Sequence, residues 1–323
     1  MKTVLIEIAS YRDDELAKTV ASLLDQAKYP ERLRFAIAHQ YGPETEHALD
    51  TWRDDERFRI HEIEWQEARG LGVARRRCDD MYHGEDFYFQ IDAHMRAEPD
   101  WDARLEREWT ELGDDMAILS SYPPAYKYVS ASEVEFVPSD PNRLVVNAMY
   151  MGFVPTFFGQ ALRADTSRRG AFLAGGFQFG PGRVCADVQY EPDVCFVGDE
   201  VVHSLRVFAA GYRAYSVLDQ VLWHLYLRSE YQPNARHFWK DFQETPELAR
   251  IYEQMNARSR EVMQRYFAGE TDVRLEAVHA YENFAGVDFR QHTVHPEMYE
   301  LPKLPIADGD EWRARATPPH TQA

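Results

Sequence analysis

An aspartate and a histidine stand two residues apart at the end of an apolar segment, and their chemistry is the first that the sequence suggests. Residues 87–91, FYFQI, have the aromatic-rich composition and short length of a buried strand. Asp92 and His94 follow directly. Because residues i and i+2 of a strand project to the same side, the carboxylate and the imidazole can converge on one point. The spacing predicts a metal site, although a turn-capping aspartate followed by a surface histidine explains the same pair.

The segments around this pair alternate between strand and helix patterns. This alternation is typical of a parallel sheet with crossover helices, so the expected fold class is α/β. Ligands of such sheets bind at the carboxyl ends of the strands, which is where Asp92 and His94 lie. The expected strands are residues 2–9, 33–39, 60–64 and 87–91, and the expected helices are residues 13–27 and 71–82.

The second half of the chain predicts further elements. A helix over residues 200–210 has Asp199 as its expected N-cap and Gly211 as its stop. Residues 214–228 are expected to form one strand, residues 245–267 are helical, and residues 316–323 form a loose tail. We expect a main domain at 1–229 and a helical C-terminal extension with its tail at 230–323, packed on the same domain.

Composition excludes several classes of partner. The 323 residues carry 36 Lys and Arg against 54 Asp and Glu, a net charge of -18 that repels phosphate backbones and anionic membranes. We therefore expect no nucleic-acid partner. The 3 cysteines include no Cys-x-x-Cys pair, so neither a disulfide framework nor a zinc ribbon is indicated. No apolar stretch reaches the ~20 residues of a membrane span, and we expect a cytoplasmic protein.

Several stretches together resemble one family of glycosyltransferases. They are IEIASYRDD and KTVASLLDQAKYP near the start, EARGLGVARRRCDDMYHGEDFYFQIDAHM in the middle, and FVGDEVVHSLRVFAAGYRAYSVLDQVLWHLYLR and AYENFAGVDF later. The sequence resembles the GlcNAc-transferase family that contains the UDP-N-acetylglucosamine:protein-hydroxyproline enzymes and, more distantly, the polypeptide N-acetylgalactosaminyltransferases. The resemblance covers most of residues 3–290. It implies the GT-A type nucleotide-sugar-binding fold, a mostly parallel mixed sheet flanked by helices, with a helical C-terminal extension.

The resemblance also implies a third metal ligand, His224, beside Asp92 and His94. Carboxylate and imidazole donors suit Mn²⁺, with Mg²⁺ as the alternative. Such a cation would stabilise the UDP that departs from a UDP-sugar. A lone histidine beside apolar residues is more often a satisfied core residue, so that interpretation of His224 stays open.

Basic residues and glycines predict the nucleotide site. Arg69 and Arg75 enclose Gly70, which permits close backbone approach, and the following helix N-terminus favours anions. A guanidinium can hold a phosphate bidentately. A solvated basic helix face is the alternative, and it accounts for Arg76 or Arg77. From topology, the end of the first strand would contact uracil and ribose. The residues expected at the UDP-sugar are Ser10, Tyr11, Arg12, Arg69, Gly70, Arg75, Asp92, Gly175 and Gly176.

The resemblance places the acidic pair Asp199 and Glu200 at the sugar pocket as the catalytic candidates. Glu200 is the better candidate for contact with the donor sugar or the acceptor hydroxyl, because Asp199 is equally explained as a helix N-cap. Gly175 and Gly176 would let the sugar approach the backbone. Three tyrosines could stack on a sugar or peptide acceptor, or simply pack in the core: Tyr122, Tyr126 and Tyr128.

We therefore expect a metal-dependent, retaining glycosyltransferase that moves GlcNAc or a related sugar from a UDP-sugar to a hydroxyl acceptor on a protein or glycan. One alternative is an inverting enzyme with Glu200 or Asp199 as general base. Another is a non-catalytic protein that binds nucleotide sugars or glycans. Replacing Asp92 by Ala is expected to abolish metal-supported UDP binding, whereas Asp102, further along the same stretch, is expected to be replaceable with little effect on it.

Overall fold

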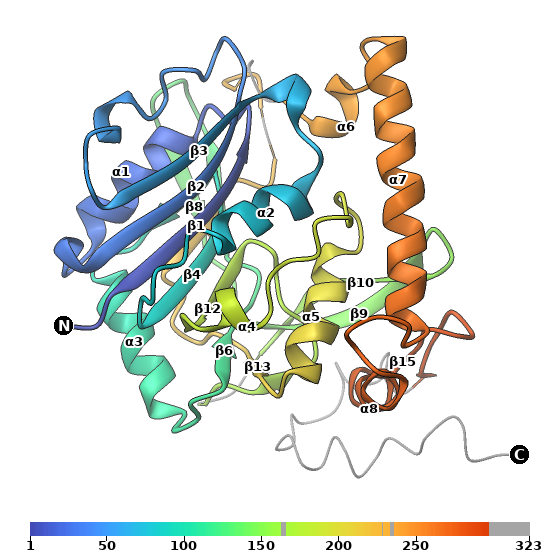
Figure 1. Cartoon of the computed structure of the whole chain (residues 1–323). Coiled ribbons are helices and arrows are strands. Elements are labelled where there is room, and N and C mark those ends of the chain that lie inside the picture. The colour runs from blue at the N-terminus through green and yellow to red at the C-terminus, as the bar shows by residue number, and fades with distance from the viewer. Residues whose placement is uncertain (163–165, 228, 233–235, 297–323) are drawn as a thin grey trace, which may run out of the picture.

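A central mixed sheet organises the molecule. The computed structural model describes residues 1–162, 166–227, 229–232 and 236–296. Within these ranges eight strands form the sheet in the order β11 (Arg169–Gly170), β13 (Arg213–Tyr215), β6 (Ala117–Leu119), β12 (Phe177–Pro181), β4 (Phe87–Asp92), β1 (Val4–Tyr11), β2 (Leu33–Tyr41) and β3 (Phe58–Glu64). The pairs β4–β1, β1–β2, β2–β3 and β13–β6 are parallel, whereas β12 and β11 run antiparallel to their neighbours. The predicted α/β class with a mostly parallel sheet is confirmed (Figure 1).

Helices cover both faces of this sheet, and β1 contributes side chains to each. Val4, Ile6 and Ile8 belong to a core shared with α1 (Leu16–Gln26) and α3 (Trp101–Glu111). Leu5 points the other way, into a core shared with α2 (Leu71–Asp79), α4 (Val184–Asp187) and α5 (Asp199–Ala209). Successive strand residues face opposite sides, so a strand between two helical layers is apolar along most of its length.

A smaller sheet lies beyond the carboxyl end of β4. In the described part of the chain its four strands are β5 (Met95–Ala97), β14 (Leu222–His224), β7 (Ala125–Tyr128) and β8 (Val134–Val137), in that order. Ala93 and His94 connect β4 to β5 and thus join the two sheets. His224 pairs with Met95 of β5, next to His94. The small sheet therefore brings two distant histidine segments together.

The segments after residue 229 pack onto the middle of the chain. They include α6 (Phe238–Asp241), a long α7 (Pro246–Phe267), α8 (Leu275–Ala285) and the short strands β15 (Val287–Asp288) and β16 (Thr293–Val294). Side chains of α7 and α8 share one core with α5 and with the hairpin of β9 (Asn142–Tyr150) and β10 (Val154–Ala161). In Figure 1, α7 stands along one side of the molecule with α8 at its end. A domain boundary at residue 229 stays a prediction, and residues 316–323 lie outside the described residues.

Two local predictions are wrong. Residues 214–228 do not form one strand, because β13 belongs to the central sheet and β14 to the small one. The chain between them turns where Asp219 binds Arg104 and the amides of Leu218 and Asp219 bind Glu108. Asp199 is not an N-cap, because it is the first residue of α5 and the cap is Gly198, whose φ is 91°. Glycine accepts this left-handed conformation without strain.

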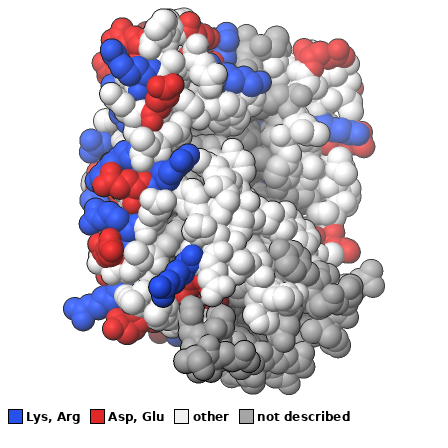
Figure 2. All heavy atoms as spheres, turned by 90° about the vertical axis from the view of Figure 1, so that its right-hand side faces the viewer, with Lys and Arg blue, Asp and Glu red and all other residues white. Residues whose placement is uncertain are grey.

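Charge is unevenly distributed over the described residues of one face. On the face drawn in Figure 2, Lys, Arg, Asp and Glu lie mainly towards the edges, and the described residues nearer the middle are largely uncharged. Of the helices in the described ranges, none combines the length and the apolar character that crossing a bilayer requires.

Candidate active site

The three predicted metal ligands meet at the junction of the two sheets. Asp92 ends β4, His94 follows it, and His224 ends β14. One carboxylate oxygen and one nitrogen from each histidine all lie within 4.8 Å of one another. His224 Nε2 is 3.1 Å from Asp92 Oδ2, and the two imidazole rings are 4.6 Å apart. This donor set has the composition of a site for a transition-metal cation such as Mn²⁺.

Asp92 is held in its ionised form. Burial alone raises the pKa of this carboxyl, but the hydrogen bond from His224 lowers it, and so do the charges of His224, His94 and Arg75. The net effect holds the pKa of Asp92 well below its usual range. A carboxylate that stays charged at all physiological pH values is suited to bind a cation.

Arg75 connects Asp92, one of the predicted metal ligands, to the acidic pair on α5. Its guanidinium is 5% exposed. Nη1 donates to Asp199 Oδ2 at 2.6 Å and to the Tyr190 hydroxyl at 3.2 Å, while Nη2 lies 3.7 Å from Asp92 Oδ1. Arg77, two residues on, has a side chain that is 52% exposed. The helix thus turns one arginine to the site and another to solvent.

Gly175 and Gly176 leave room for these two charged side chains. A Cβ atom on Gly175 would lie 2.5 Å from Arg75 Nη2, and one on Gly176 would lie 2.4 Å from Asp92 Oδ2. Both separations are far shorter than real Cβ contacts. A side chain at either position would have to displace Arg75 or Asp92, so the protein's own side chains favour glycine here, a reason other than the sugar contact that the sequence suggested.

Glu200 lies beside this glycine pair, and the pKa of its buried carboxyl is raised. Its Oε1 accepts the backbone N–H of Gly175 at 2.6 Å. Burial and then the neighbouring Asp199 carboxylate raise the pKa of Glu200 to about 8. Burial also raises the pKa of Asp199, against the opposing charge of Arg75. At pH 7 the Glu200 carboxyl is suited to donate a hydrogen bond rather than to accept a proton.

Several of these groups line a cavity of about 340 Å³, a size within the usual range for small-molecule sites. Its polar side is formed by Arg75, Asp92, Asp199 and Glu200. Much of the apolar lining comes from β10 and from the segment before α5. The remaining lining residues are Leu71, Tyr122, Val154, Pro155, Thr156, Phe157, Gly175, Gly176, Phe196, Val197, Gly198 and Val201.

The predicted uracil and ribose residues lie at the end of β1. Ser10 is buried, and its hydroxyl has no hydrogen-bond partner among the described residues. The Tyr11 hydroxyl donates to Asp241 Oδ2 at 3.1 Å. Arg12 donates to Asp241 at 2.9 Å and to Glu44 at 2.6 Å. The side chains of Tyr11 and Arg12 thus connect β1 to α6, and a nucleotide role for them stays a prediction.

The loop before α2, which the sequence predicts to bind phosphate, makes close contacts with the chain itself, and its nucleotide role stays a prediction. Arg69 is exposed and donates to the backbone carbonyls of Gln66 and Ala68. The amide of Leu71, the first residue of α2, donates to the carbonyl of Cys195 at 2.6 Å. A Cβ atom on Gly70 would also meet Cys195. The close approach that Gly70 permits is therefore made by the chain itself.

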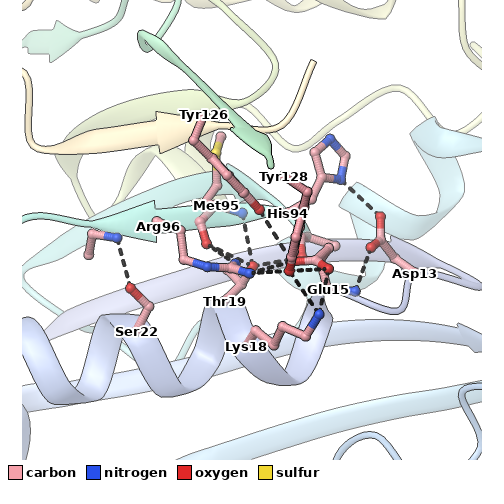
Figure 3. Close-up of polar contacts among 12 residues, drawn as sticks. Asp13, Glu15, Lys18, Thr19, Ser22, His94, Met95, Arg96, Tyr126 and Tyr128 are labelled. Carbon is pink, nitrogen blue, oxygen red and sulfur yellow. Dashed lines mark hydrogen bonds and ion pairs between the residues drawn. The ribbon is translucent and has the colours of Figure 1, made fainter. Parts of the chain in front are cut away.

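Of the three predicted stacking tyrosines, Tyr122 alone lines the cavity. Tyr126 and Tyr128 are buried, and their hydroxyls bind Glu15. They connect the small sheet to the start of α1 (Figure 3). Tyr126 and Tyr128 therefore fit the alternative interpretation, in which the tyrosines pack in the core.

Sequence reasoning missed two residues of the site. Tyr190 is fully buried beneath Arg75, and its hydroxyl accepts from Gln90 and Gln178. No motif surrounds Tyr190, so nothing in the sequence could have indicated it. Asp13 lies 2.9 Å from His94 Nδ1. Its place directly after Ser-Tyr-Arg, in a stretch already singled out, was a usable signal.

Solved structures of two glycosyltransferases are similar to this chain. GalNAc-T7, solved with UDP, GalNAc and Mn²⁺, has a TM-score of 0.59 and 14% identity, and the match covers 93% of this chain and 57% of that one. The chain thus spans little more than half of GalNAc-T7. TarS 1–349 from S. aureus has a TM-score of 0.47 and 11% identity, with 93% and 83% of the two chains covered. The likeness to GalNAc-T7 identifies the fold as a GT-A type glycosyltransferase fold.

The family model described as "Glycosyltransferase (GlcNAc)" matches residues 3–51 and 44–297. The chain belongs to this GlcNAc glycosyltransferase family, as its sequence motifs predicted. No curated protein sequence gave a significant match.

Proposed function

We propose that this protein is a metal-dependent, retaining glycosyltransferase that moves GlcNAc or a related sugar from a UDP-sugar to a hydroxyl acceptor on a protein or glycan. The observation that carries the proposal is the convergence of Asp92, His94 and His224 beside a cavity that also holds Arg75 and Glu200. The UDP, GalNAc and Mn²⁺ in the GalNAc-T7 structure support this donor class and cation.

Asp92, His94 and His224 would hold the divalent cation, Mn²⁺ or Mg²⁺. Carboxylate oxygen together with imidazole nitrogen fits Mn²⁺ better, because Mg²⁺ prefers oxygen ligands. When bound, the cation supplies Lewis-acid stabilisation of the charge that develops on departing UDP. In the protein, the lowered pKa of Asp92 keeps that ligand ionised. All three ligands are intact, which argues against a non-catalytic binding protein.

The acidic pair supports retention rather than inversion. Asp199 is bound to Arg75, and burial together with the Asp199 charge raises the pKa of Glu200 to about 8. An inverting enzyme requires a general base that accepts the proton of the acceptor hydroxyl. A protonated Glu200 and an arginine-bound Asp199 are poor bases at pH 7. In a retaining, front-face reaction the departing phosphate oxygen can accept that proton, and stabilisation of the leaving group dominates catalysis.

The proposal is tested by incubating the protein with a panel of UDP-sugars and Mn²⁺ and measuring UDP release. Proton NMR then reads the first-formed anomer before mutarotation. We expect fastest release from UDP-GlcNAc or a close relative and an α product from the α-linked donor. A β product would favour the inverting alternative and make Glu200 or Asp199 the base.

Two variants distinguish further between Glu200 as a general base and Glu200 as a group that only positions the substrates. Glu200→Gln keeps the size of the side chain and a hydrogen-bonding group, and it resembles the protonated carboxyl. We expect it to retain at least about a tenth of the activity, because general-base removal typically costs 10²- to 10⁴-fold. Asp92→Asn, which removes a charged ligand, should be far more damaging. If Glu200→Gln were the more damaging change, the retaining assignment would be wrong.

A further inference from the structure

Asp13, in the loop between β1 and α1, uses its two carboxylate oxygens for different purposes. Oδ1 accepts the backbone N–H of Glu15 at 2.9 Å, which fixes the turn into α1. Oδ2 lies 2.9 Å from His94 Nδ1, and the two side chains are 10% and 24% exposed (Figure 3). The turn therefore determines where the second oxygen points, and that oxygen faces a histidine of the metal-ligand set.

An imidazole that donates Nδ1–H to a carboxylate keeps the lone pair of Nε2 free for a cation. We propose that Asp13 is a positioning residue that holds His94 in this tautomer and fixes the plane of its ring, so that Nε2 faces Asp92 and His224. The inference rests on the proposed metal dependence. It concerns a residue that contributes no ligand atom itself, and carboxylates of this kind generally increase metal affinity 10- to 100-fold.

The segment that carries Asp13 is itself held rigidly against the small sheet. Glu15 has a fully buried side chain, and it accepts hydrogen bonds from Tyr128 at 2.9 Å and from Lys18 at 2.8 Å. Arg96 of β5 donates to the same carboxylate. Figure 3 shows these contacts converging on Glu15 beside the Asp13–His94 pair.

The same contacts relate Asp13 to the second histidine. β14, which carries His224, pairs with β5 on one side and β7 on the other. Glu15 binds side chains from both of these flanking strands. The loop from Asp13 to Glu15 thus fixes the ring of His94 directly and the strand of His224 through its neighbours. A preorganised pair of ligands loses less conformational entropy when the cation binds.

The test uses Asp13→Asn in the full chain. Asparagine has the same shape but only one carbonyl oxygen. When that oxygen accepts the Glu15 N–H, the amide NH₂ faces His94 Nδ1 and favours the Nε2–H tautomer, whose protonated nitrogen cannot bind a metal. We expect a Mn²⁺ dissociation constant 10- to 100-fold weaker by calorimetry without nucleotide. The midpoint of thermal unfolding of the metal-free protein should stay almost unchanged.

Asp14→Asn is the matched control, because it removes the same charge from the same loop. Asp14 is partly buried in the same loop, but it is Asp13 whose carboxylate faces His94 Nδ1. Asp14→Asn should therefore change Mn²⁺ affinity less than about threefold. Long-range ¹H–¹⁵N spectra of the metal-free protein should show His94 protonated at Nδ1 in the wild type and in Asp14→Asn, and at Nε2 in Asp13→Asn.

Three outcomes are decisive. Equal Mn²⁺ affinity of Asp13→Asn and wild type would overturn the positioning role, and so would equal weakening by Asp13→Asn and Asp14→Asn. A wild-type His94 protonated at Nε2 would overturn it as well. Failure of the proposed function looks different, because the wild type would then bind no Mn²⁺ while the tautomer of His94 would still follow Asp13.

Discussion

Arg75 lies between the two groups of acidic residues at the cavity, with Asp199 on one side and Asp92 on the other. We expect Arg75→Ala to weaken UDP binding by about 1.5 to 3 kcal/mol, the usual cost of losing a charged hydrogen bond. The variant should also unfold more easily, since the buried Asp199 loses its cation. Calorimetry with UDP and Mn²⁺, together with thermal unfolding, measures both effects.

Arg77→Ala is the control for this prediction, because Arg77 belongs to the same helix and is half exposed. Its replacement should change UDP affinity and stability by less than about 0.5 kcal/mol. If both variants bound UDP equally well, the assignment of Arg75 to the diphosphate would have to be abandoned.

Asp102 has a structural role that the sequence did not indicate. Its expected dispensability for UDP binding stays a prediction, but its side chain is completely buried. It accepts the backbone N–H of Lys28 at 2.7 Å and of Tyr29 at 3.2 Å, and it binds Arg32 Nε at 3.0 Å. Asp102→Ala should lower the free energy of unfolding by about 3 kcal/mol, because a buried cation and two amides lose their acceptor. Urea unfolding measures this change.

Asp50→Ala is the control for Asp102→Ala, because it breaks contacts to Arg53 and His47 that lie at the surface. Its cost should stay below about 1 kcal/mol. Similar unfolding midpoints for the Asp102 and Asp50 variants would show that the buried contacts contribute nothing.

Among the elements, β1 carries an unusual residue at its centre. Glu7 is 2% exposed, and its Oε1 has no hydrogen-bond partner among the described residues. Burial raises the pKa of Glu7 from 4.5 to about 8. Between these values the folded chain keeps a proton that the unfolded chain releases, so the contribution of Glu7 to stability falls as the pH rises towards 8.

Glu7→Gln removes this titration while keeping the shape of the side chain. We expect the variant to gain stability over the wild type by more than about 1 kcal/mol at pH 8, with little difference at pH 4.5. Thermal unfolding across this pH range provides the measurement. Glu56→Gln, at an exposed position, should follow the wild type at every pH. A Glu7→Gln advantage independent of pH would refute the linkage.

The sequence predicted elements better than contacts. Strands such as β1 and β2 could be predicted from the sequence, because burial between two helical layers makes a strand apolar along most of its length. Asp92 and His94 were readable because a strand fixes the direction of residues two apart. By contrast, the role of Gly70 depends on Cys195, more than a hundred residues away, and no local pattern encodes such a contact. The same is true of Tyr190 beneath Arg75.

At the scale of the whole molecule, we expect UDP to stabilise the folded protein only when the proposed cation is bound as well. A ligand that binds only the folded state, present at 100 times its dissociation constant, adds about 2.7 kcal/mol to stability. We expect UDP to raise the midpoint of thermal unfolding with Mn²⁺ present and to have little effect with EDTA. In Asp92→Ala, UDP should shift the unfolding midpoint by the same small amount with Mn²⁺ and with EDTA. Equal UDP-induced shifts with Mn²⁺ and with EDTA in the wild type would exclude metal dependence.

The core that α7 and α8 share with the β9–β10 hairpin has a consequence for synthesis of the chain. β10 forms one wall of the cavity, yet the side chains that pack behind it include Met263 and Tyr281. A ribosome adds about 5 to 20 residues per second. The hairpin therefore waits on the order of ten seconds for its packing partners, long after β1 to β4 have emerged. Nascent chains stalled before α7 should contain the proposed cation ligands but lack the core that supports the β10 side of the cavity.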